Sequence, residues 1–528
     1  MKTIKRAAIL VALACAAILS MSQTGNVPEA KPGFVIANGW EPNTLDPSLM
    51  SGVPEFRIFT ALFEGLVVND PRTSRAVPGV AESWSVSPDG LRITFRLREC
   101  TWSDGTPITA RTVVDSWLRT LDPVTGSEYA YMINMVVKGA EAFNYGEGRA
   151  SDVGIRAVDD RTFEVQLISP MPYAVDMMAQ PVFAILPMHV IRTRGESWTQ
   201  PRYFTGNGPF KLQSWKPQEA LTVVPNPRYW DAGNVSLGKV TFLPIEDSLT
   251  AYYKFKAGEI DWANGIPLES IDEIRLRPDY RVSPQVATYY YIFNVTRKPF
   301  DDARVRKALA LALDRQTLVD KVTKGGQLPT TSLVPAMDGY EPPPGNGFDP
   351  ALARKLLADA GYPGGKGFPP VTLMYNTSEG HKKIAEWVQE SWKRLLGISV
   401  SLRNMEWGTF LDMRQSTHDF QLCRAGWIGD YLDPTTFLDM FVSGSGLNDG
   451  LYSNKEYDRL IRAAAALPAG PERMETLRKA EDLLVRVDQA VIPFYNYVQQ
   501  DLIDLESWDG WFPNPLGVHP WKFIRPKD

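Results

Sequence analysis

Residues 424–438 read RAGWIGDYLDPTTFL, and this stretch shows how one part of the chain is built. Its first residues are typical of a buried strand, and Gly429 gives the backbone freedom to turn after that strand. Asp433 comes directly before a proline, and an aspartate followed by proline is a common start of a helix. We therefore predict that Asp433 caps a helix. Asp430 lies in the connection between strand and helix and has no such structural role.

The pattern of strand, connection and helix repeats through the chain from about residue 287. We predict strands over 371–376, 398–404 and 419–427, and helices over 303–322, 350–361, 381–397 and 408–415. The helix over 303–322 should start at Asp302 and the helix over 350–361 at Asp349, since aspartate is a good N-terminal cap. Alternating strands and helices indicate an α/β lobe with a parallel or mostly parallel sheet.

The first part of the chain has a pattern of short strands and turns. Residues 91–98 alternate between apolar and polar side chains, which is typical of a half-buried strand. Thr109 is a suitable cap for the helix that follows. More strands are predicted within 206–245, and then a helix over 251–257 that ends at Gly258.

Ligands of open α/β sheets bind outside the carboxyl ends of the strands. Three predicted connections emerge at that edge, over 376–381, 404–407 and 430–431. They bring together a carboxylate, an imidazole and aromatic rings, with two arginines nearby. Such a set suits a ligand with one cationic and one anionic end, for example a zwitterionic peptide. The candidate residues are Asp430, Tyr431, His381, Trp407, Arg414 and Arg424.

Most of these candidates also have a structural interpretation. Asp430 would then be an incidental aspartate on a surface loop. His381 would be a solvated residue at a helix start, and Arg414 a surface cation. Arg424 has fewer such alternatives, because an arginine inside a sheet needs a partner.

The bulk properties exclude some classes of function. The chain has 528 residues, which suggests about three domains at roughly 150 residues each. A net charge of −5 without a basic stripe argues against a nucleic acid as partner. The sequence contains no HExxH, GxSxG or GxxxxGK motif, so the signs of an enzyme are weak. An exported hydrolase remains a distant alternative.

The N-terminus has the features of a secretory signal. Three basic residues precede an apolar run over 7–19, and small residues follow it, so we predict export and cleavage after residue 22. The run is too short to be a lone membrane span. Cys15 leaves a lipid anchor open as an alternative, although the residues before it match the usual motif poorly. The remaining cysteines, Cys100 and Cys423, lie far apart, and we expect no disulfide.

Several further motifs carry a resemblance to a known family. They are LDP at 45–47, LFEGLVV from Leu62, AESWSVSPDG from Ala81, WSDGTPITA from Trp102, GNGPFKL from Gly206, GEID from Gly258 and YNTSEGHKKIA from Tyr375. With these motifs and the 424–438 stretch, the chain from about Val35 onward resembles the periplasmic oligopeptide-binding proteins of ABC importers. These proteins belong to the bacterial extracellular solute-binding protein family 5, of the peptide- and nickel-binding type.

The resemblance implies an α/β, three-domain periplasmic-binding-protein-like fold, in which two lobes are joined by hinge strands. The implied segments are a signal peptide over 1–22, a discontinuous domain I over 26–63, 188–286 and 498–528, an inserted domain II over 64–187, and domain III over 287–497. The lobes are expected to close around an extended peptide that is bound through its backbone like an added strand. Such recognition tolerates many side chains, because main-chain groups are common to all peptides.

The resemblance also implies roles for individual residues. Asp430 matches the aspartate that pairs with the α-ammonium group of the peptide. The residues implied to bind the peptide backbone are Ser51, Gly52 and Val53 in one lobe and Gly426, Trp427 and Ile428 in the other. The residues implied to receive the carboxylate of peptides of different lengths are Arg414, Arg424 and His381. The candidates for the pocket walls are Trp407, Tyr289, Tyr291, Tyr495 and Tyr497.

The sequence departs from its relatives at two places. A cysteine pair that bridges the lobe in some relatives is replaced by Ala287 and Ile428, and a tyrosine that lines the pocket falls at Met135. The implied function is that of a monomeric periplasmic receptor, without cofactor, metal or catalysis. It delivers oligopeptides to a membrane permease and its ATPase subunits. A dipeptide, murein-peptide or metal-chelate binding protein of the same family is the alternative.

Overall fold

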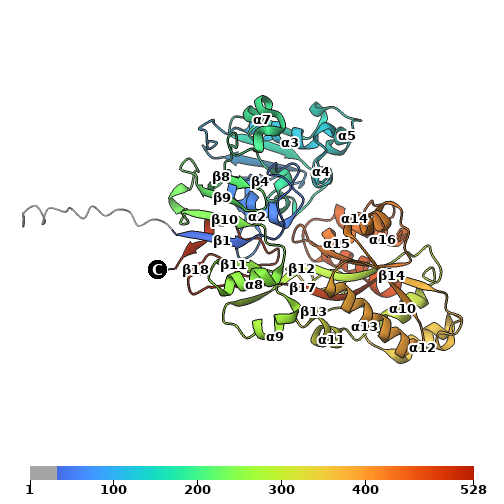
Figure 1. The fold of residues 1–528 in the computed structure, drawn as a ribbon. Coiled ribbons are helices and arrows are strands. Elements are labelled where there is room, and N and C mark those ends of the chain that lie inside the picture. The colour runs from blue at the N-terminus through green and yellow to red at the C-terminus, as the bar shows by residue number, and fades with distance from the viewer. Residues whose placement is uncertain (1–31, 528) are drawn as a thin grey trace, which may run out of the picture.

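The structure, a computed structural model, describes residues 32–527, so the predicted signal peptide lies outside the described residues. The chain forms two lobes (Figure 1). Two long strands run between the lobes, β12 (Tyr280–Phe293) and β17 (Val491–Ile503). They pair with each other in antiparallel fashion, in the middle of a sheet that continues into both lobes.

The large sheet has eleven strands, in the order β15-β14-β16-β12-β17-β11-β1-β10-β9-β8, with β13 beside β17. The bounds of the other strands are β15 Val400–Met405, β14 Val371–Asn376, β16 Leu422–Ile428, β11 Trp262–Asn264, β1 Gly33–Ala37, β10 Lys239–Leu243, β9 Ala220–Pro225, β8 Phe210–Lys216 and β13 Leu328–Pro329. β14 is parallel to β15 and β16, whereas β12 is antiparallel to β16. The sheet of the second lobe is therefore mixed, and the prediction of a mostly parallel sheet was wrong at the strands that cross from the first lobe.

The first lobe contains a second sheet of four antiparallel strands, in the order β4-β5-β7-β6. The strands outside the large sheet are β2 Val67–Asn69, β3 Ala76–Pro78, β4 Ala81–Val86, β5 Arg92–Leu97, β6 Ile155–Asp159, β7 Thr162–Gln166, β18 Trp508–Asp509 and β19 Arg525–Pro526. The four-stranded sheet lies within residues 64–187, although the domain boundaries themselves stay a prediction. The predicted half-buried strand is confirmed as β5, in which Ile93, Phe95 and Leu97 are buried.

The helices of the first lobe are mostly short. Their bounds are α2 Val53–Leu62, α3 Ala110–Leu121, α4 Ala130–Asn134, α5 Ala140–Asn144, α6 Ala174–Met177, α7 Met188–Arg194, α8 Ser248–Lys256 and α9 Ile271–Ile274. Thr109 and Thr112 form a capping box at the start of α3, which confirms the predicted cap. Gly258, with φ of 72°, follows α8 as predicted.

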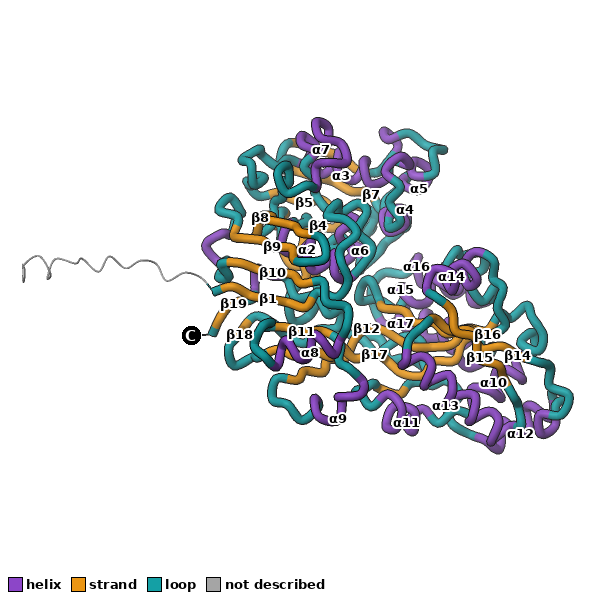
Figure 2. The backbone as a smooth tube through the Cα atoms, in the orientation of Figure 1, coloured by secondary structure: helices purple, strands orange, loops and turns teal. Residues whose placement is uncertain are grey.

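Helices cover both faces of the sheet in the second lobe (Figure 2). Their bounds are α10 Ala303–Leu311, α11 Arg315–Leu318, α12 Pro350–Asp359, α13 Glu379–Leu396, α14 Trp407–Leu411, α15 Thr435–Leu438, α16 Lys455–Ala466 and α17 Pro471–Asp482. Alternate residues of β12 point to opposite faces. Tyr291 joins the apolar core under α10, α12 and α13, while Ile292 joins the core under α15, α16 and α17.

The predicted helix over 303–322 is interrupted. It divides into α10, α11 and a turn of π-helix over Val319–Thr323. The side chain of Asp314 accepts the backbone N–H of Thr317 at 3.2 Å and so starts a new helix. A capping residue inside an apolar periodic pattern is enough to divide the helix. The other elements predicted in this lobe are present near their expected bounds, and Asp349 caps α12 as predicted.

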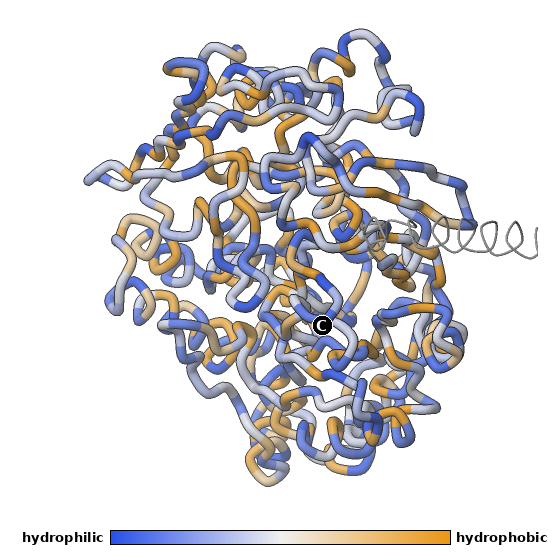
Figure 3. Tube along the Cα trace, turned by 90° about the vertical axis from the view of Figure 1, so that its left-hand side faces the viewer, coloured by the Kyte–Doolittle hydropathy of each residue, from blue (hydrophilic) through white to orange (hydrophobic). Residues whose placement is uncertain are grey.

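Hydrophobic and hydrophilic residues are interspersed along the tube (Figure 3). Among residues 32–527, no helix combines the length and the apolar character needed to cross a membrane.

Candidate functional site

The three predicted connections do converge. β14, β15 and β16 are mutually parallel, so their carboxyl ends lie at one edge of the sheet. The connection after β14 is bonded to the end of β15, because the hydroxyl of Thr377 donates to the side-chain oxygen of Asn404 at 2.7 Å. The connection after β16 carries Asp430, and it leads directly into α15.

Asp433 is a structural residue, as predicted. Its carboxylate is buried and accepts the backbone N–H of Thr435, the first residue of α15, at 3.1 Å. The helix begins one residue later than expected. Arg473 of α17 donates to both oxygens of Asp433, at 2.6 and 2.8 Å. The sequence pattern did not predict this ion pair, which fixes the connection to a neighbouring helix.

Asp430 has no cationic partner among the described residues, in contrast to Asp433. Two tyrosines of the first lobe, Tyr131 and Tyr129, lie near its carboxylate. Part of the Asp430 surface stays open, but protein encloses the carboxylate on most sides. This burial raises the pKa of Asp430 to about 7, against the opposing effect of the Tyr131 hydroxyl. Asp430 is thus a carboxylate that ionises incompletely until a cation arrives.

Tyr129, Tyr131 and Gln180 of the first lobe were missed by the sequence analysis. Gln180 donates from its side-chain nitrogen to the backbone oxygen of Asp430 at 2.8 Å. These residues lie about 250 positions or more before Asp430, and no local pattern connects them to it. Only their aromatic and amide character could have marked them as candidates.

Arg424 has no anionic partner among residues 32–527. It projects from β16, and its guanidinium donates to the Tyr497 hydroxyl at 2.9 Å and to the Asn376 side chain at 3.4 Å. It also lies over the ring of Tyr289, 5.2 Å from the centroid. Its Nε is buried without a hydrogen-bond acceptor. A guanidinium in this state retains the capacity to bind a carboxylate.

His381 lies in the first turn of α13, close to Arg424. Its ring centroid is 5.6 Å from that of Tyr289. Burial and the charge of Arg424 together lower the pKa of His381 to about 3, so the imidazole is neutral at pH 7. His381 and Tyr495 line a cavity of about 150 Å³. His381 is half-buried at the start of α13, and its implied role toward a ligand carboxylate stays a prediction.

Arg414 differs from Arg424 because it already has an anion. Its Nε lies 2.8 Å from a carboxylate oxygen of Asp449, and both side chains are almost fully buried. The alternative of a free surface cation is therefore wrong for Arg414. Its implied role toward a ligand carboxylate stays a prediction.

β16 leaves part of one edge free. It pairs with β12 along its length, but with β14 only at Leu422 and Cys423. From Arg424 to Ile428, the side away from β12 has no strand partner in the described structure. Gly426 is close-packed, since a Cβ there would lie 2.9 Å from the Tyr497 hydroxyl. The indole of Trp427 donates to the Thr436 hydroxyl at 3.3 Å.

The other predicted residues fall into exposed and buried groups. Ser51 and Val53 are exposed at the start of α2. A Cβ on the extended Gly52 would lie 2.3 Å from the Glu55 carboxylate, which would have to shift. Trp407 is about half exposed, at 49%. The residues that form part of the buried core beside Arg424 are Tyr289, Tyr291 and Tyr495, with Tyr497 half-buried at its border.

Ala287 and Ile428 face each other directly in the pairing of β12 with β16. Two cysteines at these positions could form the disulfide bridge that some relatives have. This chain has alanine and isoleucine there and cannot form it. Cys100 and Cys423 are both free, as predicted. Within residues 32–527, no three His, Cys, Asp or Glu side chains gather in a way that could hold a metal ion.

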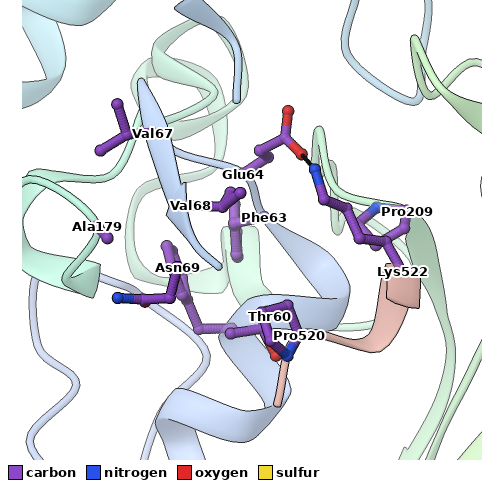
Figure 4. A pocket seen from close by; sticks show the side chains of 11 residues that line it. Thr60, Phe63, Glu64, Val67, Val68, Asn69, Ala179, Pro209, Pro520 and Lys522 are labelled. Atoms are coloured by element: carbon purple, nitrogen blue, oxygen red, sulfur yellow. Dashed lines mark hydrogen bonds and ion pairs between the residues drawn. The ribbon is translucent and has the colours of Figure 1, made fainter. Parts of the chain in front are cut away.

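A small cavity in the first lobe belongs to the core. Figure 4 shows Glu64 and Lys522 pointing toward each other across it, and their charged atoms are 3.2 Å apart. The Trp230 indole donates to Glu64 at 2.6 Å, and the Tyr229 hydroxyl also donates to it. The volume of about 20 Å³ is that of roughly one water molecule.

Residues 75–449 match the profile of the bacterial extracellular solute-binding proteins, family 5 middle region. The chain is 39% identical to the periplasmic oligopeptide-binding protein OppA of Salmonella typhimurium, over 96% of this chain and 95% of that protein. It is 37% identical to the periplasmic murein peptide-binding protein MppA of Escherichia coli, over 96% of each chain. The crystal structure of Haemophilus influenzae OppA in complex with the peptide RPPGFSPFR is similar with a TM-score of 0.80 and 33% identity, over 95% of this chain and all of that chain. The chain belongs to the bacterial extracellular solute-binding proteins of family 5.

Proposed function

We propose that this protein is an extracytoplasmic receptor that binds oligopeptides between its two lobes and delivers them to the permease of an ABC importer. The proposal rests on the charged groups of two residues that lack partners of opposite charge in the described structure. Among residues 32–527, the enclosed carboxylate of Asp430 has no cationic partner and the guanidinium of Arg424 has no anionic partner. An unpaired charge in such a place is unfavourable, and a zwitterionic ligand relieves both charges at once.

The spacing of these two charges fits a short peptide. Arg424 and Asp430 are six positions apart, and an extended chain of six residues spans at most about 20 Å. The α-ammonium group would bind to Asp430, and the carboxylate would bind to Arg424 or, for other lengths, to His381 or Arg414.

The free edge of β16 supports recognition through the peptide backbone. An extended peptide beside Gly426 to Ile428 would continue the sheet, and Ser51 to Val53 would supply contacts from the first lobe. Main-chain contacts of this kind accept many side-chain sequences. The names of the Salmonella and Haemophilus relatives support an oligopeptide as the ligand.

The rest of the proposal concerns the cellular context. The protein is a monomer that is exported by cleavage after residue 22, works in the periplasm and catalyses no reaction. It closes by bending at β12 and β17 when a peptide supplies contacts to both lobes. The similarity to MppA favours a murein peptide as the second candidate ligand.

Calorimetry with a series of ligands tests the proposal. The protein is freed of bound ligand by unfolding and refolding, and is then titrated with trialanine, dialanine, a murein tripeptide and a nickel–histidine complex. We expect the tightest binding for trialanine and no cleavage of it on long incubation. Tighter binding of the nickel complex, or the appearance of peptide fragments, would contradict the proposal.

A further inference from the structure

Residues of the first lobe hold three consecutive residues of the connection after β16. Gln180 donates to the backbone oxygen of Asp430 at 2.8 Å. The ring of Tyr173 stacks on Tyr431, with centroids 4.6 Å apart and planes inclined by 6°. Arg75 donates to the backbone oxygen of Leu432 at 3.5 Å. We refer to these six residues as the interlobe clasp.

Two of the three clasp residues on the first lobe, Arg75 and Tyr173, are held by an ion pair or by burial. Arg75 pairs with Asp176 at 2.9 Å, and the same carboxylate accepts the backbone N–H of Ala76 at 2.7 Å. Tyr173 is only 7% exposed, and the guanidinium of Arg473 lies 5.5 Å from the centroid of its ring.

The connection on the second lobe is equally constrained. The backbone N–H of Asp430 donates to the Thr436 hydroxyl at 3.2 Å, and Tyr431 is 3% exposed. The residue after Leu432 is Asp433, with its ion pair to Arg473. Arg473 therefore contributes to both sides of the clasp, through Asp433 and through the ring of Tyr173. The clasp joins two rigid segments rather than two mobile loops.

We propose that Arg75, Tyr173 and Gln180 are positioning residues for recognition of the peptide amino end. Their contacts join the two lobes, so separation of the lobes would break them, and they hold Asp430 and the two residues after it. Closure of the lobes and correct placement of the Asp430 carboxylate are therefore one event. This inference rests on the proposed function of Asp430 as the partner of the peptide α-ammonium group.

Loss of one clasp contact should weaken binding in a specific way. A stacked ring pair or a hydrogen bond changes an equilibrium by roughly two- to tenfold. A loosened Asp430 should also distinguish less well between a free and a blocked amino end. A contact that serves only folding would lower the melting temperature and leave this discrimination unchanged.

The test compares trialanine with N-acetyl-trialanine by calorimetry, in the full-length exported protein and in Tyr173→Ala, Tyr173→Phe and Gln180→Ala. We expect Tyr173→Ala to bind trialanine about tenfold more weakly and to lose part of the preference for the free amino end. Tyr173→Phe keeps the stacked ring and should restore both properties. Gln180→Ala, at a half-buried position, provides a second test if Tyr173→Ala does not fold.

Two results would overturn the inference, and they are distinguishable. If the wild type prefers free trialanine and both alanine variants keep the same ratio, the clasp has no positioning role and the proposed function stands. If the wild type itself shows no preference for the free amino end, the assignment of Asp430 fails, and the inference fails with it.

Discussion

Arg473 binds both carboxylate oxygens of Asp433, whereas Asp430, three residues earlier, has no cation within the described structure. Two aspartates in one connection thus have opposite electrostatic environments. One is neutralised inside the protein and holds the fold. The other is held near the lobe interface, with a raised pKa, in a state that favours the arrival of a cation.

Asp433→Asn should destabilise the protein without changing its choice of ligand. Removal of one partner of a buried ion pair costs about 3–5 kcal/mol, because Arg473 would keep an uncompensated charge. Thermal and denaturant unfolding measure this loss. The ratio of affinities for free and N-acetylated peptides should stay at its wild-type value. An unchanged unfolding transition would show that the ion pair has no structural importance.

Peptide affinity should decrease as the pH falls below 7. The pKa of Asp430 is about 7 in the unliganded protein, and a bound ammonium group would lower it, so binding must release a proton at acidic pH. Peptide affinity should fall by up to about tenfold for each pH unit below 7. Calorimetry between pH 5 and 7.5 measures it, and Asp430→Asn should show no such dependence in this range. Constant wild-type affinity from pH 5 to 7.5 would contradict the assignment.

The same pKa shift has a consequence for stability. Because the folded-state pKa of Asp430 is raised, its contribution to stability is present below the unfolded value of about 4 and is lost as the pH rises through 7. A bound peptide should therefore stabilise the protein more at pH 7.5 than at pH 5.5.

Arg424→Met should reduce the affinity for peptides whose carboxylate reaches Arg424. The expected loss is about 2–5 kcal/mol, the usual effect of removing one partner of a buried charge pair. The substitution should change the affinity for the same peptides in their C-terminal amide form only slightly. Peptides of two to five residues identify the length that depends on Arg424. The matched control is Arg403→Met, at an exposed position of β15 in the same sheet. A loss that is equal for acids and amides would exclude the carboxylate role.

The double variant Ala287→Cys and Ile428→Cys should form a disulfide spontaneously under oxidising conditions. The two positions are direct partners in an antiparallel pair, where Cα atoms lie about 4.5–5.5 Å apart, within the range of disulfides. The bond closes a long loop and should stabilise the protein by about 2–4 kcal/mol. Melting with and without reductant measures the gain, and each single variant serves as a control. Cys100 and Cys423 stay free in either case, so two free thiols are expected in the oxidised and unfolded double variant, and four would contradict the observed register.

Local patterns in the sequence predicted much of the fold. The cap at Asp349, the capping box at Thr109 and the alternation in β5 each depend on residues that are close in sequence. The interruption at Asp314 was missed because the apolar period of the helix continues across it. The mixed sheet was missed because the pairing of β12 with β17 joins residues about 200 positions apart.

The candidate site was predictable only in part. The convergence of the three connections follows from parallel strands, and the different roles of Asp430 and Asp433 follow from the proline after Asp433. The partners that distinguish Arg414 from Arg424 are not visible in the sequence, because Asp449 and Tyr497 lie on separate elements. Tyr131, Tyr173 and Gln180 come from the other lobe, and only the folded chain brings them to Asp430.

The most direct test of the account is calorimetry of Asp430→Asn with trialanine and with N-acetyl-trialanine. The account predicts that free trialanine loses about 2–5 kcal/mol of binding free energy, while the acetylated peptide loses little. Asp412→Asn, an exposed aspartate in the same lobe, should change neither affinity. Equal losses for both peptides, or no loss for either, would contradict the claim that Asp430 binds the amino end of a peptide.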